Sequence, residues 1–141
     1  MSRFPPVIER ILPRAVLDEV RAGRDEAAQA IEQASLSWLL VRQVGNRDAV
    51  EFLQADLNLG EAEVIVLARE TNADRILMDD LDARRFARRL GFDLIGTMGL
   101  LLAARQRGEI SSVRNEIGRL AALGFRVAPS LVEAILKEAG E

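Results

Sequence analysis

The sequence predicts an α/β fold in which helices flank a small parallel sheet. Short apolar segments with strand composition alternate along the chain with longer segments of helical periodicity. Such alternation is typical of strands joined by crossover helices, which make neighbouring strands parallel. The segment 61–70 is apolar on nearly every side, and 75–78 is a short apolar run after it, so these two are expected to be a buried helix and a buried strand.

The first half of the chain is expected to begin with helices. Pro13 begins the first helix and Gly23 ends it, because proline is favoured at the first helical position and glycine after the last. Apolar spacing predicts further helices at residues 24–34 and 47–57. Between them, residues 37–44 have strand composition.

The second half alternates in the same way. A basic helix is expected at residues 82–90 with Gly91 at its end, followed by a strand at 92–96. Thr97 is expected to cap a helix at 98–106, and two more helices are expected at 113–123 and 129–139. The alternation therefore continues almost to the end of the chain.

Composition excludes several classes of chemistry. The chain has 141 residues, 49% hydrophobic and 29% charged, as expected of one globular domain spanning residues 1–141. It contains no cysteine and no histidine, which excludes disulfides, zinc fingers, cysteine nucleophiles and histidine-based triads. Any catalysis must therefore use carboxylates, hydroxyls, lysine, arginine or a metal ion.

Charge and hydropathy limit the partners. The net charge of −3 argues against broad electrostatic capture of nucleic acid, although the 19 Lys and Arg residues can still cluster on one face. No apolar segment approaches the ~20 residues of a membrane span, and the N-terminus lacks the apolar core of a signal peptide. A cytoplasmic protein without a membrane partner is expected.

Two acidic clusters lie at the ends of buried elements. Glu61 and Glu63 open the buried helix, and Asp79, Asp80 and Asp82 follow the strand after it. Where such ends converge, the carboxylates repel one another, and a hard divalent cation with oxygen ligands offsets this repulsion most directly. The sequence therefore points to metal-dependent phosphodiester chemistry.

Each acid also has a structural explanation. Asn58 and Glu61 have the spacing of a capping box, and either Asp80 or Asp82 is expected to cap the next helix. Capping needs only one acid at each site, so it leaves the remaining acids unexplained. The arginines of that helix form either a solvated face or a phosphate-binding ridge: Arg84, Arg85, Arg88 and Arg89.

Four short motifs occur together along the chain: Gly60-Glu61-Ala62-Glu63, Asp79-Asp80-Leu81-Asp82, Gly96-Thr97-Met98-Gly99-Leu100-Leu101, and Gly124-Phe125-Arg126-Val127 with the helix that follows it. In combination they resemble the PIN-domain superfamily, most closely a prokaryotic subgroup related to VapC-type toxins. The resemblance implies a three-layer α/β/α fold with a small parallel sheet. It also implies a metal-dependent ribonuclease, often the toxin half of a toxin–antitoxin pair.

By this resemblance, Mg²⁺ or Mn²⁺ is held by four acids, which fall on Glu19, Glu61, Asp80 and Asp82. Glu63, Asp79 and Thr97 are neighbours that would support them. The expected reaction is metal-assisted hydrolysis of RNA, with DNA left open as the substrate, and the expected partner is a small antitoxin protein. The alternative is a non-catalytic PIN-like protein that acts through protein binding or oligomerisation.

One departure from the family pattern concerns the start of the chain. Family members usually begin with a hydrophobic strand ending in an Asp-Thr-Ser-like or Asn-Thr-Ser-like turn and then a helix, before the segment that here starts near Phe4. An upstream start codon, a decayed gene or a strand from another chain would each account for the difference. By the resemblance, the Asp of that strand is normally a metal ligand. We therefore expect an N-terminally truncated domain, activity impaired by the missing Asp, and a homo-oligomer in which exposed strand edges pair.

Overall fold

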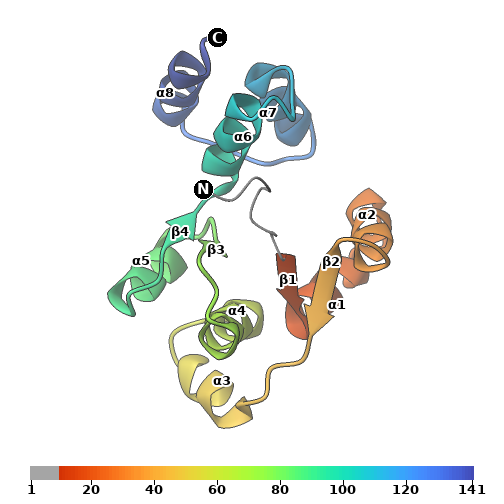
Figure 1. The fold of residues 1–141 in the computed structure, drawn as a ribbon, viewed down its shortest axis with the longest axis vertical. Coiled ribbons are helices and arrows are strands. Elements are labelled where there is room, and N and C mark those ends of the chain that lie inside the picture. The colour runs from red at the N-terminus through yellow and green to blue at the C-terminus, as the bar shows by residue number, and fades with distance from the viewer. Residues whose placement is uncertain (1–9) are drawn as a thin grey trace, which may run out of the picture. The chain divides into compact units, whose positions relative to one another are not determined.

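A computed structural model of the chain describes residues 10–141. The start near Phe4 of the segment that matches the family pattern lies outside the described residues. The chain forms two compact units, one ending at Ile76 and the other spanning Leu77–Glu141. Figure 1 shows the elements of both units.

The first unit contains a two-stranded parallel sheet. Strand β1 (Arg10–Pro13) pairs in parallel with β2 (Leu39–Arg42), with Arg10 opposite Leu39 and Pro13 opposite Arg42. The crossover between them consists of helices α1 (Arg14–Ala22) and α2 (Glu26–Ser35), which pack on each other (Figure 1). The sequence did not predict β1, because four residues ending in proline carry little strand signal and pairing with β2 supplies the missing stabilisation.

Helix α4 (Leu59–Thr71) is the core of the first unit. Seven of its residues are buried, as the apolar pattern predicts: Gly60, Ala62, Glu63, Ile65, Val66, Leu67 and Ala68. It packs against α1, β1 and α3 (Arg47–Leu53). Full burial of side chains such as Ile65 and Leu67 contributes roughly 1.5–3 kcal/mol each.

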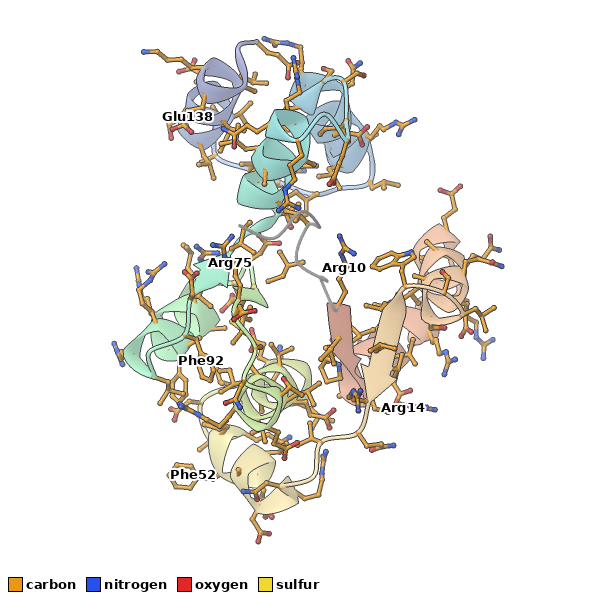
Figure 2. The ribbon with its side chains drawn as sticks, viewed as in Figure 1. Arg10, Arg14, Phe52, Arg75, Phe92 and Glu138 are labelled. Carbon is orange, nitrogen blue, oxygen red and sulfur yellow. The ribbon has the colours of Figure 1, made fainter. Side chains whose placement is uncertain are left out.

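Helix α3 is shorter than the expected range of 47–57. It ends at Leu53, and residues 54–56 form a turn before α4. Its single buried residue is Val50, whereas Phe52 is 81% exposed and projects away from the helix (Figure 2). Because this segment has little apolar surface to bury, the helix does not continue beyond Leu53.

A short strand pair lies at the start of the second unit, and its first strand begins at Ile76, the last residue of the first unit. Strand β3 (Ile76–Leu77) pairs with β4 (Leu94–Ile95), and the Met78 N–H donates to the Ile95 carbonyl at 3.0 Å. Helix α5 (Leu81–Arg89) connects them and packs on β4. Three helices that contact one another complete the unit: α6 (Thr97–Gln106), α7 (Val113–Ala122) and α8 (Pro129–Ala139).

The expected role of Thr97 as a helix cap was wrong. Gly96 is the N-cap of α6 and has no side chain to accept a bond, while Thr97 is the first helical residue. The α/β class with a small parallel sheet is confirmed by the strands and helices above. In the described part of the chain, no helix is both long and apolar enough to cross a membrane.

Candidate metal-binding acids

The buried carboxylate of Glu63 connects three elements of the first unit. Its Oε1 accepts from the Ala15 N–H at 3.0 Å, and its Oε2 accepts from the Arg47 guanidinium at 2.7 Å. Helix α1 starts after Pro13, which provides no side-chain cap, and has no acidic residue in its first turn. Glu63 on α4 therefore supplies the anionic cap of α1 through Oε1. Its other oxygen, Oε2, binds Arg47, so both carboxylate oxygens are used.

Glu61 closes the capping box expected from the sequence. The Asn58 N–H donates to Glu61 Oε1 at 3.2 Å, and the Glu61 N–H donates to Asn58 Oδ1 at 2.8 Å. The side chain is half-buried at the start of α4. Its second oxygen, Oε2, accepts no hydrogen bond from any described residue.

Glu19 lies against Gly60, the residue before Glu61, because a glycine leaves room for it. A Cβ atom added to Gly60 would lie 2.5 Å from Glu19 Oε1 and 3.2 Å from Oε2. The exposed Glu19 carboxylate, carried by α1, therefore rests directly on the first turn of α4. Of the four acids assigned by the resemblance, Glu19 thus contacts the turn of α4 that carries Glu61.

In the second unit, Asp79 supplies the cap that Gly96 lacks. Its Oδ1 accepts from the Thr97 N–H at 2.8 Å, and its Oδ2 accepts a short hydrogen bond from the Thr97 hydroxyl. Beside it, the Arg84 guanidinium donates to the Met78 carbonyl at 2.7 Å. Asp79 is therefore fully engaged at the N-terminus of α6.

Asp80 and Asp82 have separate environments. Asp80 is the N-cap of α5, and its Oδ2 accepts from the Ala83 N–H at 2.9 Å. The Asp82 side chain is 92% exposed and lies 3.6 Å from Arg85, a distance at which an exposed pair contributes little. The repulsion among the three aspartates is thus already reduced by two helix N-termini and by arginine.

The acids fall into two groups by the oxygens that remain available. Glu63 and Asp79 use both carboxylate oxygens in hydrogen bonds. Glu61 and Asp80 each use one oxygen, while Glu19 and Asp82 accept no hydrogen bond from the described residues. A capping role therefore leaves Glu61 and Asp80 able to bind a cation through the second oxygen.

Carboxylate oxygens are the donors that Mg²⁺ and Mn²⁺ prefer, so the donor set fits these ions. The Glu19 carboxylate occupies the space beside Gly60 that a Cβ atom would fill. Within each unit taken alone, no three described Asp or Glu residues gather closely enough to hold a metal ion. Glu19 and Glu61 belong to the first unit, and Asp80 and Asp82 to the second.

Two further carboxylates hold helix starts and were not expected from the sequence. Glu70 accepts from the Gly45 and Asn46 amides, and these hydrogen bonds lower the pKa of Glu70. At the end of the chain, Glu141 accepts from the Ser112 hydroxyl and the Val113 amide, which lower the pKa of Glu141. Both contacts join residues at least 24 positions apart, so no local sequence signal marks them.

The comparisons agree with the fold. The family model of the PIN domain matches residues 6–141. The chain belongs to the PIN-domain family. This family consists of nuclease-type domains that generally depend on divalent metal ions and bind RNA. Searches of curated proteins and of solved structures find no match.

Proposed function

We propose that the chain is a metal-dependent endoribonuclease of the PIN type and the toxin of a VapC-like toxin–antitoxin pair. Family membership supports the nuclease class. The main structural support is the contact of Glu19 with Gly60, the residue next to Glu61, together with the carboxylate oxygens that Glu19 and Glu61 keep without a hydrogen bond from the described residues. Asp80 and Asp82, in the second unit, are proposed as further acids that bind Mg²⁺ or Mn²⁺.

Each residue then has a defined task in hydrolysis of an RNA phosphodiester. Glu19 and Glu61 would present carboxylate oxygens from α1 and α4, and Gly60 leaves room for the Glu19 carboxylate. Glu63 ties α4 to the first turn of α1 and so fixes the helix that carries Glu19. When bound, the metal ion supplies polarisation of the phosphate and activation of an attacking water.

Thermal unfolding with and without Mn²⁺ tests the metal site. A cation that binds only the folded state at a hundredfold excess over its Kd adds about 2.7 kcal/mol of stability. The shift in Tm should disappear in Glu61→Gln and Glu19→Gln and should persist in Glu138→Gln, an exposed acid on α8 (Figure 2). A Tm that does not respond to millimolar Mn²⁺ would refute the site.

Cleavage of a fluorogenic RNA in Mn²⁺ tests the reaction with the same three variants. Activity lost in Glu61→Gln and Glu19→Gln but kept in Glu138→Gln supports the enzyme. Activity that survives Glu61→Gln would exclude these acids as its source. A matched DNA substrate distinguishes ribonuclease from deoxyribonuclease activity.

The second candidate is a non-catalytic PIN-like protein that acts through protein binding or oligomerisation. It is favoured by the structural roles of Glu63 and Asp79, whose oxygens are fully used within the fold. A folded protein that neither binds Mn²⁺ nor cleaves RNA would support this candidate.

The proposal also covers the cellular setting. As a toxin, the protein would act on RNA in the cytoplasm and would be restrained by a small antitoxin protein. Among the described residues, β1 and β2 pair only with each other, so self-association through strand edges is part of the proposal. A single functional domain over residues 1–141 is proposed as well, and one cooperative unfolding transition would support it.

A further inference from the structure

Helix α5 carries a continuous row of arginines on its solvent face. Ala83 and Ala87 are fully buried, and they define the face that packs on the unit. Arg85, Arg88 and Arg89 stand at relative positions i, i+3 and i+4, which lie on one side of a helix, opposite the buried alanines. We call these three residues the α5 ridge.

The ridge lacks internal compensation. Arg85 lies 3.6 Å from Asp82 in an exposed and therefore weak ion pair. Arg88 and Arg89 are exposed, and their guanidinium groups make no ion pair or hydrogen bond with any residue in the range 10–141. Like charges at these spacings repel one another, so the arrangement disfavours the isolated helix unless an anion joins it.

A structural explanation accounts for part of this row. Basic residues in the last helical turn interact favourably with the helix dipole, and Arg88 and Arg89 occupy that turn. Arg85 lies one turn earlier, where the dipole effect has faded. Arg84, by contrast, turns its guanidinium inward to the Met78 carbonyl and does not belong to the ridge.

The charge of the ridge contrasts with that of the chain. Helix α5 has four arginines and one aspartate, whereas the whole chain has a net charge of −3. Overall charge therefore cannot attract a polyanion, and any attraction must come from a local patch. The same helix is capped by Asp80 and carries Asp82, two of the proposed metal ligands, at its other end.

We propose that the α5 ridge binds the phosphate backbone of single-stranded RNA and guides the strand toward Asp80 and Asp82. This inference rests on the proposed ribonuclease function and adds the surface that holds its substrate. Guanidinium groups suit phosphate oxygens because they present several donors in one plane. The contacts involve phosphates alone, so the ridge contributes affinity without sequence preference.

The test measures binding of a fluorescently labelled oligouridylate in EDTA, so that no cleavage occurs, at 50–200 mM KCl. Three phosphate contacts contribute about 2 to the slope of log K against log salt for a single strand. The triple variant Arg85→Gln, Arg88→Gln, Arg89→Gln should therefore lose that part of the slope. Over this fourfold range of salt, the wild type should weaken about 20-fold more than the variant.

Matched controls separate the ridge from general charge and from misfolding. Arg24→Gln, Arg42→Gln, Arg126→Gln removes three exposed arginines elsewhere and should bind as the wild type does. Replacement of the three ridge arginines by lysine keeps the charge and should restore most of the salt dependence. Equal weakening in the control triple, or unchanged binding in the ridge triple, would overturn the proposal.

The outcomes also distinguish this inference from the proposed function. RNA binding that needs the ridge in a protein without Mn²⁺-dependent cleavage would refute the enzyme and keep the ridge. Cleavage with an unchanged KM in the ridge triple would refute the ridge and keep the enzyme. Competition by polyglutamate as strong as that by RNA would show that the ridge serves an acidic protein surface, which overturns the RNA assignment.

Discussion

Replacing Glu63 by glutamine should lower the free energy of unfolding by about 2–4 kcal/mol. The Glu63 side chain is only 5% exposed, and its two oxygens accept from Ala15 and Arg47. Glutamine keeps one acceptor and turns an NH₂ group toward a donor, so one charge-assisted hydrogen bond of about 1.5–3 kcal/mol is lost. Loss of the anionic cap of α1 adds roughly 0.3–1 kcal/mol.

Urea denaturation in EDTA, followed by circular dichroism, measures this change without any contribution from metal. Glu138→Gln on the exposed face of α8 is the matched control and should stay within about 0.5 kcal/mol of the wild type. If Glu63 mainly repelled other carboxylates at a metal site, its neutralisation would instead leave the metal-free stability unchanged or raise it. That result would refute the structural role assigned to Glu63.

Gly60, Asp80, Glu70 and the strand edges each allow a further test. Gly60→Ala should keep the metal-free stability or raise it by up to ~1 kcal/mol, because alanine has the higher helix propensity. The same variant should show a smaller Mn²⁺-induced shift in Tm, because the new Cβ displaces the exposed Glu19 carboxylate. A large loss of metal-free stability would contradict this prediction. Asp80→Ala should cost ~1 kcal/mol in urea denaturation and Asp80→Asn almost nothing, since Asp80 caps α5. The Gly45 and Asn46 amides lower the pKa of Glu70 below its unfolded value. The stability that Glu70 contributes is therefore present above the unfolded pKa and is lost as the pH falls through the folded pKa. Urea midpoints measured from pH 7 to pH 3 should fall less steeply in Glu70→Gln than in the wild type. Light scattering over a range of protein concentrations should show a dimer or larger species, and a strictly monomeric protein would exclude pairing through strand edges.

Local sequence signals predicted most elements because their causes are local. The burial of α4 follows from its apolar residues, and the Asn58–Glu61 capping box from side chains three positions apart. Pro13 and Gly23 flank α1 as expected, although Pro13 is the extended N-cap that ends β1, the helix starts at Arg14, and Gly23 has ordinary right-handed helical geometry. The acids of the PIN-type pattern were recognised in the same way, as residue types at short and regular spacing.

Only the tertiary structure decided what each acid does. Glu63 caps α1 through Ala15, 48 residues away, and Asp79 caps α6 through Thr97, 18 residues away. Glu19 on α1 contacts Gly60 on α4, where these two helices pack together. Strand β1 likewise depends on its pairing with β2, which lies beyond two helices in the sequence. A carboxylate accepts hydrogen bonds from whichever amide folding brings within about 3 Å, and residue order does not specify that partner. The sequence thus determined where the carboxylates lie along the chain. The packing of α1 on α4, and the contacts of Asp79 with α6 and of Asp80 with α5, decided which of their oxygens already accept a hydrogen bond.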